Sequence, residues 1–168
     1  RTLLHLAYQR KGNERVVQML IEAAADMNAV CTDGEFGLGA ASVLHWACRD
    51  GRTSTARMLL EAGADVTGSC TKLKLGGEDC DCRYTRKHCQ LIEHGWTALH
   101  LCCEGNDPDL VKLLFAAGAT GTALCNYGCG DVVGDWSRPG SGWTALHVAS
   151  QKGQADVVKE LLEHTSID

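Results

Sequence analysis

The sequence predicts an all-α protein, an α-solenoid of four helix-turn-helix repeats joined by long connections. The hexapeptide Gly-Trp-Thr-Ala-Leu-His occurs twice, beginning at Gly95 and at Gly142, and shorter versions of it end at His5 and His45. Small residues and a glycine follow each copy, and a second apolar run comes next. Repeated helix pairs of this kind bury their apolar faces by stacking on one another.

Each motif predicts the start of one helix, and each apolar run predicts a second. A hydroxyl residue opens every motif and can accept a hydrogen bond from an unsatisfied backbone N–H at the helix N-terminus. A glycine is expected to end the first helix, at Gly12, Gly51, Gly105 and Gly153. The second helices are expected to contain the apolar runs Val16–Ile21, Ala56–Leu60, Leu110–Leu114 and Val157–Leu162. Asp107 and Pro108 fit the cap and the first turn of the third of these.

This pattern resembles the ankyrin repeat, whose motif reads Gly-x-Thr-Pro-Leu-His and whose second helix ends in Gly-Ala-Asp. The resemblance covers four units, at residues 1–28, 42–67, 96–120 and 143–168. The proline of the motif is replaced by Leu3, Val43, Ala98 and Ala145. Proline is favoured in a first helical turn but is not required there, so the fold expectation stands. Because Glu160 stands where the family has leucine, we expect it to face water at the end of the stack.

The connections between the repeats are longer than the resemblance implies. The ankyrin period is about 33 residues, whereas the motif histidines are separated by 45 − 5 = 40, 100 − 45 = 55 and 147 − 100 = 47 residues. The helical parts keep register, so the surplus lies in the connections, which form β-hairpin fingers in the family. We expect a cysteine-rich insertion at 68–95, with a short strand at Lys72–Leu75, and a second insertion at 121–142.

Composition excludes several classes of protein. A formal charge of −5 argues against a general nucleic-acid binder. No apolar stretch reaches the ~18 residues of a membrane span. Arg1 and Thr2 begin inside a repeat motif rather than in a signal peptide, so we expect a fragment of a larger protein. No catalytic motif is recognisable, and we expect no enzymatic activity within these residues.

Ten cysteines are a high count for 168 residues. The resemblance implies an intracellular protein, cytoplasmic or nuclear, where clustered cysteines bind metal more often than they form disulfides. Cys48, Cys102 and Cys103 replace alanines of the family motif and are expected to be small buried hydrophobes.

Four other cysteines predict a structural zinc site in the long connection. Cys70, Cys80, Cys82 and Cys89 have the spacing Cys-x9-Cys-x-Cys-x6-Cys, and structural zinc takes four tetrahedral ligands. Alternative ligands are His88, His94, Cys125 and Cys129, with Cys31 as a weaker candidate. The competing interpretation is a mobile loop whose cysteines are incidental.

The four motif histidines are expected to form hydrogen bonds within and between repeats, as the resemblance implies, rather than a metal array. The resemblance also implies that the first helices and the fingers form a concave binding surface. We expect an intracellular protein–protein interaction module, with contacts from Trp46, Arg49, Asp50, Glu104, Tyr127 and Trp136. The alternative is a regulatory or substrate-recruiting domain of an enzyme whose catalytic part lies elsewhere.

Overall fold

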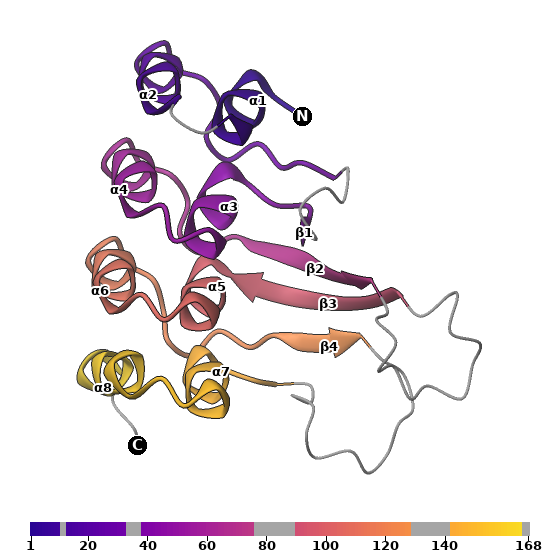
Figure 1. Ribbon diagram of the computed structural model, residues 1–168, viewed down its shortest axis with the longest axis vertical. Helices are drawn as coiled ribbons and strands as arrows, with labels where there is room; N and C mark the ends of the chain where they lie inside the picture. Colours follow the sequence, from indigo (N-terminus) through magenta and orange to yellow (C-terminus); the bar gives the residue numbers. More distant parts are fainter. Residues whose placement is uncertain (11–12, 33–37, 76–89, 129–141, 166–168) are drawn as a thin grey trace.

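The computed structural model describes residues 1–10, 13–32, 38–75, 90–128 and 142–165. Its helices form pairs that stack in chain order along the long axis, with the two termini at opposite ends (Figure 1). The inner helices, beside the strands, are α1 (Leu3–Gln9), α3 (Val43–Arg49), α5 (Ala98–Gly105) and α7 (Ala145–Lys152). The outer helices are α2 (Glu14–Glu22), α4 (Thr53–Glu61), α6 (Pro108–Ala116) and α8 (Ala155–His164). This arrangement confirms the predicted solenoid of helix pairs.

Hydroxyl and carboxylate caps begin the helices as predicted. Thr2 Oγ1 accepts a hydrogen bond from the backbone N–H of His5 at 3.4 Å. Asp107 Oδ1 accepts one from the backbone N–H of Leu110 at 2.9 Å, and Pro108 is the first residue of α6. These bonds satisfy backbone donors that have no partner inside the helix.

Three of the predicted glycines lie at the ends of the inner helices, but the left-handed conformation is displaced by one residue in the third repeat. Gly51 and Gly153 take the left-handed backbone conformation at the ends of α3 and α7, with φ of 65° and 69°. Gly105 is the last residue of α5, as predicted, and Asn106 takes the left-handed conformation with φ of 57°. Asparagine tolerates this conformation better than most residues because its short side chain can hydrogen-bond locally. Gly12 lies outside the described residues.

Four strands form one antiparallel sheet in the order β1-β2-β3-β4. They are β1 (Leu38–Gly39), β2 (Ser69–Leu75), β3 (Gln90–Thr97) and β4 (Asn126–Gly128). β2 and β3 belong to the middle connection, and β1 and β4 come from the connections on either side of it. The short strand predicted at Lys72–Leu75 lies inside β2, whereas β3 was not predicted. The fingers of three successive connections are therefore hydrogen-bonded to one another.

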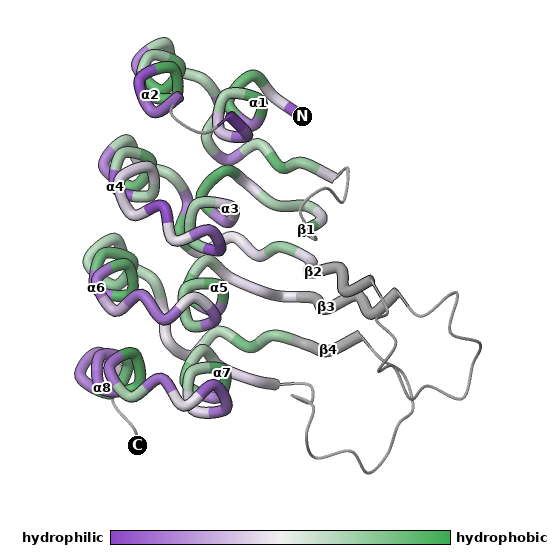
Figure 2. Tube along the Cα trace, viewed as in Figure 1, coloured by the Kyte–Doolittle hydropathy of each residue, from purple (hydrophilic) through white to green (hydrophobic). Residues whose placement is uncertain are grey.

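The core lies between the helices and at the bases of the fingers. Hydrophobic segments occur on every helix, and hydrophilic segments gather toward the turns between paired helices (Figure 2). Cys48, Cys102 and Cys103 are at most 1% exposed, which confirms that they act as small buried hydrophobes. Burial raises the pKa of the Cys103 thiol to about 12, so this thiol remains protonated and unreactive.

Glu160 is an exception to the apolar pattern of the outer helices. It was expected to face water but is only 8% exposed. Its Oε2 lies 3.2 Å from Nζ of Lys112 on α6, and its Oε1 lies 3.4 Å from Nε2 of His164. The expectation is wrong because this position of α8 faces the preceding repeat, where Lys112 provides the opposite charge. The hydrogen bond to Glu160 raises the pKa of Lys112.

Candidate functional site

The first three motif histidines connect their inner helices to the fingers that follow. Nδ1 of His100 accepts the backbone N–H of its N-cap residue at 3.3 Å, so the ring proton is on Nε2. The Nε2–H then donates to the carbonyl of Trp143 at 3.2 Å. His45 makes the equivalent bonds, with the carbonyl of Gly68 as acceptor at 3.1 Å. Nε2 of His5 lies 3.1 Å from the carbonyl oxygen of Ala41.

These bonds confirm the structural interpretation of the histidines. Burial lowers the pKa of His45 and that of His100, which keeps both rings neutral and able to serve as one donor and one acceptor. His147, in the last repeat, accepts the backbone N–H of Thr144 at 3.2 Å but is exposed. No further finger covers it within the described residues, so only the helix cap remains.

A cysteine occupies the same place at the base of all three fingers. Cys31, Cys70 and Cys125 each lie seven residues after a residue in the left-handed conformation, as the differences 31 − 24, 70 − 63 and 125 − 118 show. Each is at most 1% exposed. Each pairs in antiparallel register with the residue that precedes the next helix cap, namely Ala41, Trp96 and Trp143. The repeat therefore explains these three cysteines as parts of its own core.

A column of polar residues runs down the stack at the C-terminal ends of the inner helices. Its members lie four residues after each motif histidine and are Gln9, Arg49, Glu104 and Gln151. The first three are half-buried and the last is exposed. Residues one place after the histidines are apolar instead. The column therefore offers a row of side chains that changes in charge from one repeat to the next.

The comparison with known families agrees with this geometry. A family model described as ankyrin repeats in three copies matches residues 1–70 and again residues 68–168.

This chain belongs to the ankyrin-repeat family. Ankyrin-repeat domains are in general protein-binding modules, and the comparison identifies no catalytic domain. No curated protein matches this ankyrin-repeat chain. Among the described helices, none combines the length and the apolar character that crossing a membrane requires.

The ankyrin fold buries one of the residues predicted to contact a partner. The Trp46 side chain is 1% exposed, and its ring centroid lies 4.8 Å from that of His5 and 6.0 Å from that of Tyr8. Both neighbours belong to α1, so the preceding repeat covers the indole. The prediction that Trp46 contacts a partner is therefore wrong.

Two other predicted contacts form a charged pair at the end of α3. Nη2 of Arg49 lies 2.7 Å from Oδ1 of Asp50, and the side chains are 20% and 29% exposed. The hydroxyl of Tyr8 donates to Oδ2 of Asp50 at 2.9 Å. Glu104 is half-buried, and its backbone carbonyl accepts a hydrogen bond from Nε2 of Gln154 at 3.2 Å. Arg49, Asp50 and Glu104 thus lie at the C-terminal ends of two neighbouring inner helices.

The remaining predicted contacts are in the fingers. Tyr127 lies in β4, where its backbone is opposite Glu93 of β3. Trp136 lies outside the described residues. Their part in binding stays a prediction.

The structure divides the predicted zinc ligands into two groups. Cys70 and Cys125 share the recurring place of Cys31, and His94 lies in β3 opposite Asn126. The other candidates, Cys80, Cys82, Cys89, His88 and Cys129, lie outside the described residues. Across the described part of the chain, no three His, Cys, Asp or Glu side chains gather closely enough to hold a metal ion. Zinc binding stays a prediction.

Sequence reasoning missed the contact between Tyr8 and Arg52. The guanidinium carbon of Arg52 lies 4.3 Å from the centroid of the Tyr8 ring, and Nη1 of Arg52 donates to the Tyr8 carbonyl at 2.9 Å. Burial, and then the neighbouring Asp50 charge, raise the pKa of Tyr8 above its ordinary value. The contact joins the first two repeats across 44 positions in the sequence, so no local pattern indicates it.

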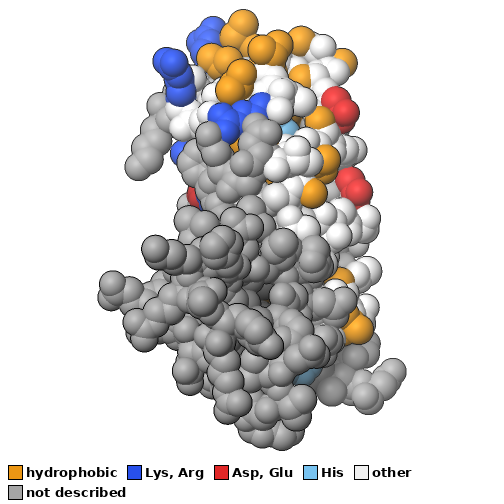
Figure 3. All heavy atoms as spheres, turned by 90° about the vertical axis from the view of Figure 1, so that its right-hand side faces the viewer, with side chains coloured by type: hydrophobic (Ala, Val, Ile, Leu, Met, Phe, Trp, Pro, Cys, Tyr) orange, Lys and Arg blue, Asp and Glu red, His pale blue; other side chains and the backbone are white. Residues whose placement is uncertain are grey.

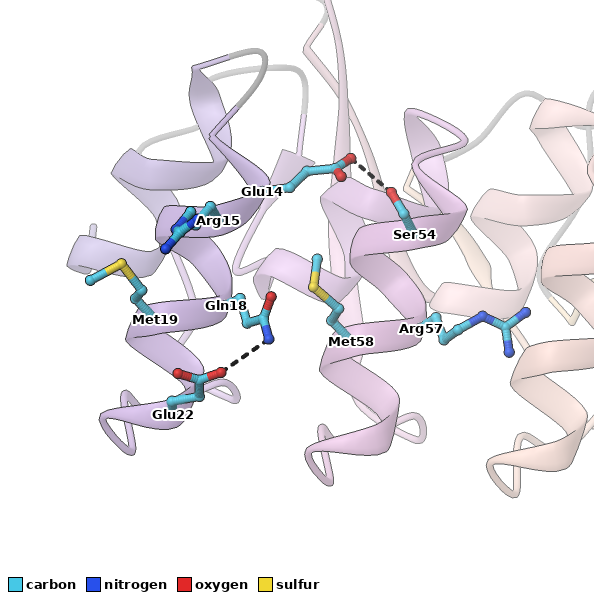
Figure 4. Close-up of a pocket in the computed structure, with 8 residues that line it drawn as sticks. All are labelled: Glu14, Arg15, Gln18, Met19, Glu22, Ser54, Arg57 and Met58. Carbon is cyan, nitrogen blue, oxygen red and sulfur yellow. Dashed lines mark hydrogen bonds between the residues drawn. The ribbon is translucent and has the colours of Figure 1, made fainter.

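A groove of about 710 Å³ lies between the outer helices α2 and α4 (Figure 4). Glu14 spans it by accepting a hydrogen bond from the Ser54 hydroxyl at 2.7 Å. Acidic and basic side chains and two methionines line the groove. The lining residues are Glu14, Arg15, Gln18, Met19, Glu22, Ser54, Arg57 and Met58.

Proposed function

We propose that this chain is an intracellular interaction module that binds another protein through its inner-helix ends and its fingers. The polar column carries the proposal, because its side chains are half-buried or exposed and differ between repeats. The apolar residues one place after the histidines are buried in the second, third and fourth repeats. Stacked repeats present an extended surface of this kind. The alternating charge of Arg49 and Glu104 suits a partner of complementary charge pattern, which favours specificity over affinity.

A matched pair of variants tests the surface. The column variant combines Glu104→Ala with Gln151→Ala. The control combines Arg57→Ala with Lys159→Ala, two exposed positions that are equivalent to each other on the outer helices. Proteins captured from cell extract by the unmodified chain are expected to be lost with the column variant and kept with the control. Circular dichroism checks that both variants keep their helices.

Capture that survives in the column variant, or that falls equally in both variants, would contradict binding at the inner-helix ends. A fall in the control variant alone would place the binding surface on the outer helices instead.

We also propose that the fingers bind one zinc ion. Its ligands would come from Cys80, Cys82 and Cys89 of the middle connection, with His88 or His94 of the same connection, or Cys129 of the next one, as alternatives. Their chemistry supports this, since thiolate sulfur and imidazole nitrogen are the ligands that structural zinc prefers. Ordering a backbone costs ~1–2 kcal/mol per residue, and a metal ion can offset that cost in a reducing compartment.

Metal analysis of protein purified without a metal-affinity tag tests the zinc proposal. We expect a zinc-to-protein ratio near one that falls with Cys80→Ser or Cys82→Ser. The control is Cys103→Ala in α5, which is expected to keep its zinc. A ratio near zero in the unmodified protein, or equal loss in the control, would remove the proposal.

A further inference from the structure

The turns that join paired helices carry charges whose sign changes along the stack. Each turn segment runs from four places after the motif histidine to the second residue of the outer helix, and in the first repeat it is one residue longer. The four segments carry net charges of +2, +1, −3 and 0 and are residues 9–15, 49–54, 104–109 and 151–156. We call this row of segments the turn ridge. Its basic end lies at the first two repeats and its acidic end at the third.

The basic end of the turn ridge keeps charge that the described part of the chain does not neutralise. Arg10 and Arg15 are exposed, and neither forms an ion pair with another described residue. The guanidinium of Arg52 contacts the ring and the carbonyl of Tyr8, which carry no charge. Arg49, by contrast, is paired with its neighbour at 2.7 Å. Lys and Arg side chains are visible at the upper end of the molecule, over the first two repeats (Figure 3).

The acidic end of the turn ridge contains three carboxylates and no basic residue. Asp107 is half-buried, and its Oδ1 accepts the backbone N–H of Leu110 at 2.9 Å while its Oδ2 accepts the hydroxyl of Thr53 at 2.9 Å. Both donors are neutral, so these bonds orient the carboxylate without compensating its charge. Asp109 is exposed and Glu104 is half-buried. A charged ligand can therefore gain favourable contacts here that the turn itself does not provide.

We propose that the turn ridge binds an extended segment of a partner protein that has an acidic block opposite the first two turns and a basic block opposite the third. Because the ridge includes Arg49 and Glu104 of the polar column, this assignment rests on the proposed function and names the chemistry of the partner. Packed helices lie about 8–10 Å apart, and an extended chain advances ~3.3 Å per residue. One repeat thus corresponds to about three residues of the segment, and the centres of the two blocks lie about five residues apart.

The order of the charges disfavours other ligands. A nucleic acid would be attracted to the first two turns but repelled by the third, because its phosphates carry charge of one sign. A uniformly basic segment would be attracted to the third turn and repelled by the first two. Juxtaposed like charges penalise such ligands, whereas a segment with both blocks meets opposite charge along the whole ridge.

Two synthetic peptides of the same composition serve as probes. The block peptide has three glutamates, two glycines and three lysines in that order, with both ends capped, and the mixed peptide has glutamate and lysine in alternation. Alternating charges largely cancel over the distance of one repeat, so only the block peptide matches the ridge. We expect fluorescence anisotropy at ~20 mM salt to show ~5-fold or tighter binding of the block peptide. The difference is expected to shrink at ~0.3 M salt.

Charge reversal in the chain gives the matched comparison. The first-turn variant combines Arg10→Glu with Arg15→Glu, two exposed positions at the basic end. The control combines Arg57→Glu with Lys159→Glu, which makes the same change in net charge at exposed positions of the outer helices. The preference for the block peptide is expected to be lost in the first-turn variant and kept in the control. Circular dichroism checks that both variants keep their helices.

A second variant separates charge from folding. Adding Glu104→Lys and Asp109→Lys to the first-turn variant gives an acidic first turn and a basic third turn. A free peptide can bind in either chain direction, so the block peptide is expected to regain part of its preference. A folding defect could not produce this rescue.

Equal binding of the two peptides by the unmodified chain would overturn the proposal, and so would equal losses in the first-turn variant and the control. Capture from cell extract distinguishes this failure from that of the proposed function. Capture that the column variant loses but the first-turn variant keeps would leave protein binding in place and exclude a charge-ordered segment. Capture kept by both variants would contradict both proposals. Salt-dependent self-association of the unmodified chain that the first-turn variant abolishes would identify a second copy as the occupant and overturn the assignment.

Discussion

The two interior repeats and the two end repeats contain the same motif, yet equivalent side chains differ in their surroundings. Leu101 of the third repeat is fully buried, whereas Leu6 at the same position of the first repeat is 46% exposed. His100 is buried and reaches the next finger, whereas His147 is exposed. The neighbouring repeat, rather than the residue itself, decides how much each position contributes to stability.

Truncation of the leucine that follows the motif histidine should show the largest difference in stability between an interior repeat and an end repeat. Leu101→Ala removes a fully buried side chain, and such changes cost ~2–5 kcal/mol of unfolding free energy. Leu6→Ala acts at an exposed position and should cost about 0.5 kcal/mol or less. Urea unfolding of both variants measures the difference. Equal losses would mean that Leu6 is already covered in solution.

Loss of the histidine should give the next largest contrast. His100→Ala leaves the Trp143 carbonyl and the Thr97 backbone N–H without this partner, which should cost ~1–3 kcal/mol. His147→Ala removes a partner from its N-cap alone and should cost less. Thermal unfolding compares the two variants. A loss for His147→Ala as large as that for His100→Ala would contradict the assignment of the stabilisation to the bond between repeats.

Acid should weaken the contacts that His45 and His100 make with the fingers. Burial lowers the pKa of His45 and His100 below 6.5 in the folded chain, so below about pH 6.5 the unfolded chain binds more protons. The free energy of unfolding should therefore stay constant above about pH 6.5. It should fall as the pH drops from about 6.5 toward the pKa of the folded state. Urea titrations at about pH 7.5 and 5.5 measure this, and His100→Gln should reduce the difference. An unchanged pH dependence in that variant would exclude His100 as a contributor.

The smallest expected effect concerns the end of α2. Ala24 takes the left-handed conformation with φ of 58°, where the second and third repeats have Gly63 and Gly118. A residue with a Cβ atom is destabilised by roughly 1–2 kcal/mol in this conformation. Glycine avoids that strain but loses more backbone entropy on folding, so part of the stabilisation is lost. Ala24→Gly should therefore stabilise the chain by about 1 kcal/mol. A lower thermal midpoint than that of the unmodified chain would contradict this reasoning.

Local patterns predicted the helices but not all of the contacts between repeats. The hydroxyl caps and apolar runs of each repeat are encoded within about 25 residues, so the pairs could be located from the sequence. β3 could not, because its partners β2 and β4 lie in other parts of the chain. Trp46 was misassigned for the same reason, since its burial depends on α1.

The finger cysteines are an intermediate case. Counting seven residues from the left-handed position of each repeat places Cys31, Cys70 and Cys125 together. Cys70 and Cys125 both lie 25 residues after their motif histidines, whereas Cys31 lies 26 residues after His5. Alignment at the ends of the second helices is therefore needed only to bring the first repeat into register with the other two. The polar column, by contrast, lies at a fixed distance from the motif histidines, so the contacts predicted for its members need no alignment at the second helices.

The sheet that joins the fingers has a mechanical consequence. β1 pairs with β2 and β3 pairs with β4, so hydrogen bonds cross from one connection to the next on the side opposite the outer helices. A stack whose repeats contact one another only through their helices can bend at every interface between repeats. Backbone pairing along a second edge resists opening on the finger side. The curvature of the first three repeats should therefore change little under load, and elastic deformation should concentrate where the pairing ends.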